Sequence, residues 1–433
     1  MKRFLPFMLS MMAILAIGCN QETQESPRNE TEAEGERKPD PEPQKPPEPV
    51  TLTLYMQSNF PIQHLIAEEV GKKYPHITIR PLLREAGQMP EDLLAAGTFP
   101  DLVYASTPWY TDYLDLQVLE DLNGWIKKSN LDISKLDPLA VDAIKMWGEN
   151  GELYALPIYR NFAVTYYNKD LFDKFGVPYP KDGMTWKEAI ELAKKLTRTE
   201  GGVEYKGLDA SESYSAVSAL SVPFVRPDGK ANLLDERFAV ALNNLKEIYG
   251  IPGNRPGINM SEFYQGTVAM SVFWNNISIL EDMHKKGNPL NWDIVTTPTY
   301  DIAPGKSFQV DSHNLSVSSL SKHKETAFHV IQFLLSKEMQ TVLSKNGFLP
   351  SLIDPDFENV FGENLQSLKG KNISAIFNQK SAPLYKITRY DSIVRGELNT
   401  ALNEVLENQS DVNTALRAAN ERADKLIEQQ RSP

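Results

Sequence analysis

Apolar and polar residues alternate over Val50–Met56, which predicts a β-strand at the start of the folded part of the chain. Helical spacing follows over residues 62–74, and short β-rich segments follow at 76–82 and 101–104. This β-α-β-α-β order predicts an α/β fold whose mainly parallel sheet is flanked by helices. Ligands of such folds bind beyond the carboxyl ends of the strands.

A second series of elements begins after residue 156. Ala163–Asn168 reads as a strand, and Thr185 to Glu188 forms a capping box that opens a helix. Residues 292–297 predict another strand, and the apolar spacing over 324–343 predicts one long helix. Residues 410–430 have the pattern of an amphipathic helix. The chain therefore contains a second α/β series.

The first fifty residues have a different composition. Two basic residues precede an apolar run over Phe4–Gly18, as in a secretory signal, and this run is shorter than the about 20 residues that cross a bilayer. Residues 20–50 contain nine acids, four bases and seven prolines with almost no aliphatic residues. We therefore predict a signal peptide over 1–19 and a disordered tether over 20–50.

Cys19 closes the apolar run in the segment Leu15-Ala16-Ile17-Gly18-Cys19. This segment resembles the bacterial lipobox, in which the cysteine is acylated and becomes the first residue of the mature chain. The leucine stands one position earlier than is usual, so the cleavage register is open. The resemblance implies lipidation at Cys19 and a membrane anchor on the extracellular face. An ordinary signal peptide with a free cysteine is the alternative.

Composition excludes several classes of protein. The 433 residues exceed one typical core, so two or three structural units are expected. The net charge of −12 disfavours nucleic-acid binding. A single cysteine excludes an intramolecular disulfide and a cysteine-rich zinc site, and no histidine spacing indicates a metal site. We expect neither a cofactor nor a metal ion.

Several short motifs occur in an order that points to one family. They are Gly97–Val103, Leu156–Ile158 with Tyr167–Phe172, Gly176–Pro178 before Thr185, Phe263–Met270 (an F-x-x-G-x-x-A-M pattern), and Ser321–Ala327 with Gly347–Pro350. Together they resemble the family 1 extracellular solute-binding proteins, which capture sugars and oligosaccharides for ABC importers. The resemblance covers nearly the whole chain beyond the tether.

This resemblance implies the two-lobe, type II fold of periplasmic binding proteins, in which three crossing segments form a hinge. The N-terminal lobe would comprise 51–158 plus 300–352, and the C-terminal lobe 159–299 plus 353–433. The implied function is capture of a carbohydrate, most simply an oligosaccharide, in the interlobe cleft and its delivery to permease subunits. The implied protein is a monomer, is anchored to the cell membrane by lipid and is not an enzyme.

A sugar presents apolar faces and a rim of hydroxyl groups, so its site needs aromatic rings and planar polar groups. Several loop positions pair such residues. The predicted ligand-binding residues are Gln57, Ser106, Trp109, Tyr159, Arg160, Asn161, Tyr214, Trp274, Asn275, Asp311, His313, Arg389 and Tyr390. Most have a structural alternative: core packing for the tryptophans, hinge bonds for residues 159–161, turn capping for Asp311 and His313, a surface pair for Arg389 and Tyr390, and the start of the next helix for Gln57.

Other functions stay open at this point. The same scaffold could bind a peptide, a polyamine or a phosphorylated polyol. A secreted polysaccharide-degrading enzyme would need two carboxylates about 5 to 10 Å apart across the cleft, which sequence does not exclude. The glycine-rich nucleotide motifs and the nucleophile-elbow motif are absent from the sequence.

Overall fold

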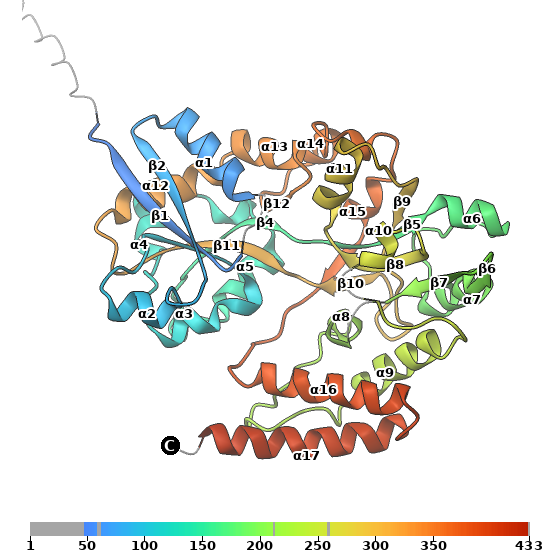
Figure 1. Ribbon diagram of the computed structural model, residues 1–433. Coiled ribbons are helices and arrows are strands. Elements are labelled where there is room, and N and C mark those ends of the chain that lie inside the picture. The colour runs from blue at the N-terminus through green and yellow to red at the C-terminus, as the bar shows by residue number, and fades with distance from the viewer. Residues whose placement is uncertain (1–46, 59–61, 211–212, 258–259, 432–433) are drawn as a thin grey trace, which may run out of the picture. The chain divides into compact units, whose positions relative to one another are not determined.

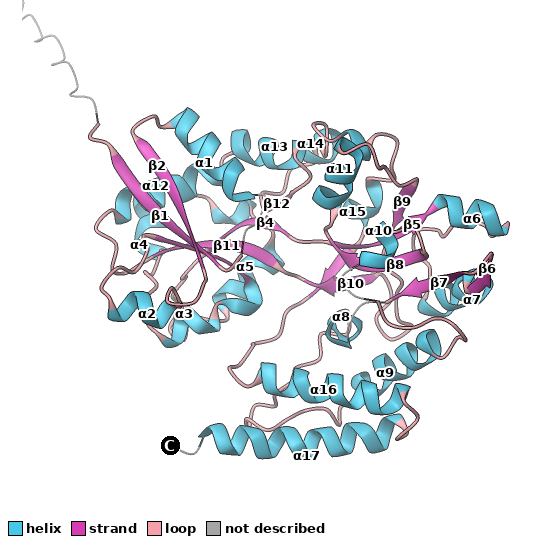
Figure 2. Ribbon diagram, in the orientation of Figure 1, coloured by secondary structure: helices cyan, strands magenta, loops and turns pink. Residues whose placement is uncertain are grey.

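Two β-sheets organise the computed structural model, which describes residues 47–58, 62–210, 213–257 and 260–431. Both sheets lie within one compact unit, residues 48–433, and helices surround them (Figures 1 and 2). We call the part built on the first sheet the N-terminal lobe and the part built on the second sheet the C-terminal lobe. The predicted signal peptide, Cys19 and most of the predicted tether lie outside the described residues.

The first sheet has the strand order β12-β4-β11-β3-β1-β2. Its strands are β1 (Val50–Met56), β2 (Ile77–Leu83), β3 (Leu102–Ser106), β4 (Leu156–Arg160), β11 (Ser312–Val317) and β12 (Leu349–Pro350). The second sheet has the order β6-β7-β8-β5-β9. Its strands are β5 (Ala163–Asn168), β6 (Arg198–Glu200), β7 (Val203–Asp209), β8 (Val268–Trp274) and β9 (Trp292–Val295). A separate pair consists of β10 (Lys306–Gln309) and β13 (Lys380–Ala382).

The helices connect and cover these sheets. In chain order the α-helices are α1 (Ile62–Lys73), α2 (Pro90–Ala95), α3 (Thr111–Asp115), α4 (Asn123–Ser129), α5 (Pro138–Lys145), α6 (Lys169–Phe175), α7 (Trp186–Leu196), α8 (Ser213–Ser218), α9 (Glu236–Tyr249), α10 (Ser261–Tyr264), α11 (Ile277–Lys285), α12 (Lys324–Leu334), α13 (Lys337–Lys345), α14 (Asp356–Val360), α15 (Ser374–Asn378), α16 (Asp391–Leu406) and α17 (Val412–Arg431). The 3-10 helices are η1 (Thr107–Trp109), η2 (Ile133–Lys135) and η3 (Gln366–Leu368).

The strand directions correct the expectation of mainly parallel sheets. In the first sheet β1 pairs in parallel with β2 and β3, but β11 pairs antiparallel with β3 and β4, and β12 antiparallel with β4. In the second sheet only the pairing of β7 with β8 is parallel among the described strands. Neighbouring parallel strands need a crossover connection, usually a helix, between them. A strand that enters a sheet from the other lobe has no such connection and can therefore pair antiparallel. The α/β class itself is confirmed.

Local sequence signals fix several element boundaries. Thr185 Oγ1 accepts from the Glu188 backbone N–H at 3.2 Å, and the Glu188 carboxylate accepts from the Thr185 N–H at 2.7 Å, so the predicted capping box is confirmed. The predicted single helix over 324–343 is wrong. Ser336 caps α13 by accepting from the Met339 N–H at 3.2 Å, which starts a new helix after α12. The apolar spacing continues through both helices, so it does not reveal the break.

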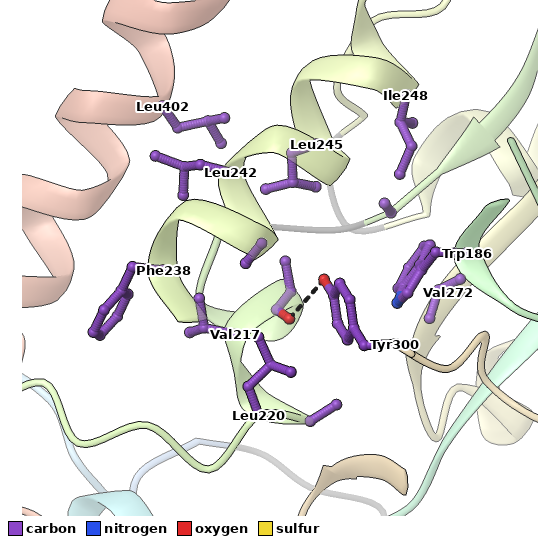
Figure 3. Close-up of a cluster of buried hydrophobic side chains, with 14 of the residues drawn as sticks. Trp186, Val217, Leu220, Phe238, Leu242, Leu245, Ile248, Val272, Tyr300 and Leu402 are labelled. Atoms are coloured by element: carbon purple, nitrogen blue, oxygen red, sulfur yellow. Dashed lines mark hydrogen bonds between the residues drawn. The ribbon is translucent and has the colours of Figure 1, made fainter. Parts of the chain in front are cut away.

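The C-terminal lobe has its own apolar core, which holds the helices against the second sheet (Figure 3). Phe238, Leu242 and Leu245 of α9 are fully buried, and Leu402 of α16 lies beside them. Tyr300 is buried in the same core and donates to the Ala216 carbonyl of α8 at 3.0 Å. Figure 3 shows this hydrogen bond as a dashed line. The core therefore fixes α8, which contributes to the site described below.

None of the helices within the described ranges is both long and apolar enough to cross a bilayer.

Gln340 of α13 is the buried polar side chain that joins the third crossing segment to the first sheet. Its Nε2 donates to the Ile158 and Leu334 carbonyls at 2.8 Å, and its Oε1 accepts from the Ser351 and Leu352 N–H groups at 2.8 and 3.1 Å. One amide thus satisfies backbone groups of β4, of the end of α12 and of the segment after β12.

We predict that Gln340→Met lowers the free energy of unfolding by about 3 kcal/mol or more, because it leaves several buried backbone groups without partners. Chemical denaturation measures this change. Gln429→Met, at an exposed position of α17, serves as the control and should change stability by less than about 0.5 kcal/mol. Equal stability of the two variants would contradict the assigned role of Gln340.

Candidate functional site

Three chain segments pass between the two sheets, and the contact between the first and the second lies at the centre of the site. The first runs from the end of β4 to the start of β5, the second from β10 to β11, and the third follows β12 (Figure 1). Asn161 in the first segment donates its backbone N–H to the Asp311 carbonyl at 2.8 Å. Its side-chain Nδ2 donates to Asp311 Oδ2 at 3.2 Å. The crossing segments therefore bring polar side chains from two sheets to one place.

Two adjoining cavities flank this contact, and we refer to them together as the cleft. The first cavity has a volume of about 290 Å³ and the second about 340 Å³, near the lower end of the range for ligand pockets. Asn161, Trp274 and Gln309 line both cavities. The first is also lined by Asp137, Arg160, Phe308, Phe377, Gln379, Lys306 and Lys380, and the second by Ser106, Trp109, Tyr214, Ser215, Asp311 and Arg395, among others.

Two tryptophans from different lobes face the cleft. Trp109 belongs to η1, directly after β3 of the first sheet, and is 51% exposed. Trp274 ends β8 of the second sheet and packs edge-on against Phe308, with ring centroids 5.0 Å apart. An exposed indole on one lobe and a fixed indole on the other provide apolar plates for a ligand with flat apolar faces.

Asp311 carries a carboxylate of which one oxygen is hydrogen-bonded and the other is not. Its Oδ2 accepts from Asn161, but its Oδ1 is buried and has no hydrogen-bond partner among the described residues. Burial raises the pKa of this carboxyl from 3.8 to about 6. A buried acceptor without a donor is unfavourable, so a ligand hydroxyl group placed here would gain a hydrogen bond at little cost to the protein.

Tyr214 and Arg395 also line the second cavity. The Arg395 guanidinium lies 3.7 Å from the centroid of the Tyr214 ring, which in turn stacks on Phe224. Tyr214 comes from α8 and Arg395 from α16, so the cation–π contact joins these two helices. Arg395 makes no ion pair with any described residue.

Arg160 lines the first cavity but is already engaged. Its guanidinium pairs with Asp137 at 2.7 Å and donates from Nε to the Pro350 carbonyl at 2.9 Å. Asp137 also caps α5 by accepting from the Ala140 N–H at 3.0 Å. This pair thus joins the first and third crossing segments to the N-terminal lobe.

Tyr159 and His313 lie behind the cleft, in the core of the N-terminal lobe. Their rings stack with centroids 4.5 Å apart, and the Tyr104 hydroxyl bonds both, at 2.8 Å to the Tyr159 hydroxyl and 2.9 Å to His313 Nδ1. Burial lowers the pKa of His313 to about 3, so the imidazole is neutral at physiological pH. Neither residue lines the two cavities.

Four other predicted residues lie outside the cavities. Asn275 donates to the Gly347 carbonyl at 3.1 Å, and Gln57 ends the first strand region with a buried Nε2 that has no partner among the described residues. The exposed Arg389 lies 5.5 Å from the centroid of the Tyr390 ring, at the start of α16. Of the predicted ligand-binding residues, those that line the cleft are Ser106, Trp109, Arg160, Asn161, Tyr214, Trp274 and Asp311.

Sequence reasoning missed several residues that line the cleft. Phe308 and Val310 alternate with the polar residues Ser307, Gln309 and Asp311, which is a strand signal that could have placed Phe308 and Gln309 at the crossing. Gln379, Lys380 and Arg395 carry no such signal. Arg395 occupies an ordinary position of a helix, and only the packing of α16 against α8 brings it to the cavity.

Comparison with known proteins identifies the family. The model for the bacterial extracellular solute-binding proteins matches residues 61–341, more than half of the chain. The chain belongs to this family. The described residues hold no group of three or more His, Cys, Asp or Glu side chains that could bind a metal ion.

Relatives in sequence and structure are solute-binding proteins. A binding protein of Brucella abortus is 27% identical over 276 residues, which cover 59% of this chain and 64% of the relative, just under two thirds of its length. An arabinooligosaccharide-binding protein of Halalkalibacterium halodurans is 22% identical, over 68% of this chain and 70% of the relative.

Solved structures show the same fold. A substrate-binding protein of Listeria monocytogenes, in complex with cycloalternan, superposes with a TM-score of 0.70 at 22% identity and covers 88% of this chain and 100% of its own. The sugar-binding protein MalE of Xanthomonas citri gives a TM-score of 0.68 at 21% identity, over 88% and 98%. The fold is therefore the two-lobe, type II fold of periplasmic binding proteins.

The raised pKa of Asp311 generates a prediction for stability. Between about pH 4 and pH 6 the folded protein holds a proton on Asp311 that the unfolded chain has released, so the free energy of unfolding falls as pH rises through this window. Asp311→Asn removes this dependence. The free energy of unfolding of the variant minus that of the unsubstituted protein should therefore increase by about 2 to 3 kcal/mol between pH 3.5 and pH 7.5.

Urea denaturation at a series of pH values measures this difference. Asp301→Asn, at an exposed loop position, is the control and should run parallel to the unsubstituted protein. If the stability of Asp311→Asn also ran parallel to that of the unsubstituted protein, the Asp311 carboxyl would not be held in the buried environment described.

Proposed function

We propose that this protein captures a carbohydrate in the cleft and delivers it to the permease of an ABC importer. The observation that carries this proposal is the composition of the cleft. Trp109 and Trp274 offer aromatic faces from two lobes, and Asn161, Gln309 and Asp311 offer planar polar groups between them. Sugars need this combination because their rings are apolar on the faces and polar at the rim.

The relatives support the same class of ligand. Several are named for saccharides, among them cycloalternan and arabinooligosaccharide, and a mannotriose complex has a TM-score of 0.67 to this chain. We propose an oligosaccharide because the two cavities adjoin and share three lining residues, so sugar units could occupy both.

Closure of the lobes would accompany binding. We propose the N-terminal lobe as residues 51–158 plus 300–352 and the C-terminal lobe as 159–299 plus 353–433, with the three crossing segments as the hinge. Shifting such a hinge from 1:99 to 99:1 takes about 5.5 kcal/mol of differential affinity. A ligand that contacts Trp109 and Trp274 at once, one ring from each lobe, would supply part of it.

The proposal includes no chemical reaction. A glycosidase would need two available carboxylates across the cleft. The carboxylates among the described lining residues are Asp137 and Asp311, and Asp137 is paired with Arg160 at 2.7 Å. This leaves one available carboxylate, which suits hydrogen bonding to a hydroxyl group better than acid–base catalysis.

We also propose that the mature chain is a monomeric lipoprotein on the extracellular face of the cell membrane. The lipobox-like segment ending at Cys19 and the acidic, proline-rich residues 20–50 support this placement. At about 3 Å per residue, the rise of an extended proline-rich linker, such a tether would hold the binding unit several nanometres from the bilayer.

Substitution of the tryptophans tests the site. Trp109→Ala and Trp274→Ala should each weaken the binding of a saccharide that the unsubstituted protein binds by about 10-fold or more, because each removes one stacking face. Isothermal titration calorimetry against a panel of neutral and acidic mono- and oligosaccharides measures the affinity. Trp125→Ala is the matched control, since Trp125 stacks on Phe328 outside the cleft. Failure of every saccharide to bind more tightly than about 1 mM would refute carbohydrate capture.

Substitution of the cysteine tests the anchor. Cys19→Ser should move the protein from the membrane fraction to the medium or the soluble fraction, because a serine cannot carry the thioether-linked lipid. Cell fractionation and metabolic labelling with a radioactive fatty acid measure this. Labelled, membrane-bound Cys19→Ser protein would contradict lipidation at this residue.

A further inference from the structure

The cleft differs in charge from the protein that surrounds it. Four of its charged lining residues are cationic and two are anionic, so the lining has a net positive charge, whereas the whole chain has a net charge of −12. The cations are Arg160, Lys306, Lys380 and Arg395, and the anions are Asp137 and Asp311. A positive cleft in an acidic protein attracts anions and repels cationic ligands such as polyamines.

Of the four lining cations, only Arg160 is paired with a carboxylate, that of Asp137, and the other three remain available. Among the described residues, Arg395, Lys306 and Lys380 form no ion pair, and Asp311 is the single lining carboxylate without a cationic partner. A ligand that carries negative groups would offset the positive charge that these three side chains give to the cleft.

Arg395 is held in place for such a contact. Its guanidinium lies on the Tyr214 ring, and that ring is backed by Phe224 at 6.2 Å. Asp391, one turn earlier on α16, attracts Arg395 through its charge but forms no ion pair with it. The Asp391 oxygens accept instead from the Tyr385 hydroxyl at 2.8 Å and from the Thr388 N–H and hydroxyl at 2.8 and 2.7 Å. Stacked on an aromatic face, the guanidinium keeps edge N–H groups for a planar, bidentate acceptor such as a carboxylate.

Lys306 and Lys380 place a second positive site in the first cavity. They are direct partners in the parallel pairing of β10 with β13. Neighbouring strands lie about 5 Å apart, so the two side chains leave the strands side by side. Like charges at directly paired positions are destabilising, and an anion between them would relieve this repulsion. The two cavities, which share Trp274 as a lining residue, thus each present a site for one negative group.

We propose that the ligand is an acidic oligosaccharide whose sugar units carry carboxylate groups, that is, a uronate-containing oligosaccharide. One carboxylate would bind Arg395 in the second cavity and another would bind between Lys306 and Lys380 in the first. The ring faces would stack on the tryptophans, and a hydroxyl group would donate to Asp311 Oδ1. This inference rests on the proposed function and names its ligand class.

Calorimetry with matched ligands tests this inference. The full chain is titrated with uronate oligosaccharides of several linkages, and with the same oligosaccharides after reduction of the carboxyl groups to alcohols. At least one acidic oligosaccharide should bind about 10-fold or more tightly than its reduced form. Its affinity should fall as NaCl rises from about 50 mM to about 500 mM, since salt screens the charge contacts.

Charge-removing variants locate the contacts. Arg395→Gln should weaken binding of the acidic oligosaccharide by about 10-fold or more, while binding of the reduced form changes little. The double variant Lys306→Gln/Lys380→Gln should act in the same direction and does not depend on the packing of α16. Arg389→Gln is the matched control, because the exposed Arg389 lies outside the cleft on the segment before α16.

The outcomes separate the two proposals. If reduced or neutral oligosaccharides bind as tightly as the acidic ones, carbohydrate capture stands and the acidic ligand is refuted. Preference for sulfated or phosphorylated saccharides over uronates would refute the carboxylate. If no saccharide of any charge binds, the proposed function fails as well. Unchanged acidic affinity in both charge-removing variants would also overturn the inference.

Discussion

The contact between Asn161 and Asp311 joins two chain segments that lie about 150 positions apart and that both pass between the sheets. The remaining features of the cleft depend on it. It fixes the end of β4 against the start of β11, and so sets where Trp109 and Trp274 face the same space. It also satisfies only one oxygen of the Asp311 carboxylate, which leaves the other buried and without a donor among the described residues. A ligand that donates a hydrogen bond to this Asp311 oxygen would therefore bind favourably.

The surroundings of the cleft divide into residues that hold the scaffold and residues that remain available. Arg160, Asp137 and Gln340 have their polar groups engaged with the crossing segments. Tyr104, Tyr159 and His313 form a bonded, stacked group in the core of the N-terminal lobe. Arg395, Lys306 and Lys380 are cationic and make no ion pair with described residues. The polar groups of the scaffold thus have their partners within the protein, whereas the cations of the cleft are left for a ligand to contact.

Much of the fold could be predicted from local patterns, because those patterns reflect interactions between neighbours in sequence. The strand at Val50–Met56 and the capping box at Thr185 are confirmed for this reason. Strand direction and the break at Ser336 were not predicted, because direction depends on which lobe a strand enters and one serine cap does not disturb the apolar spacing. Trp109, Asn161 and Asp311 could be identified from loop position, whereas Arg395 reaches the cleft only through helix packing.

The most direct test of the central claim is a crystal structure of the protein with its tightest-binding saccharide. The account predicts that the sugar rings contact Trp109 and Trp274 and that a sugar hydroxyl lies within hydrogen-bond distance, about 2.5 to 3.0 Å, of Asp311 Oδ1. A saccharide bound elsewhere on the protein, with the Asp311 oxygen still unpaired, would contradict it.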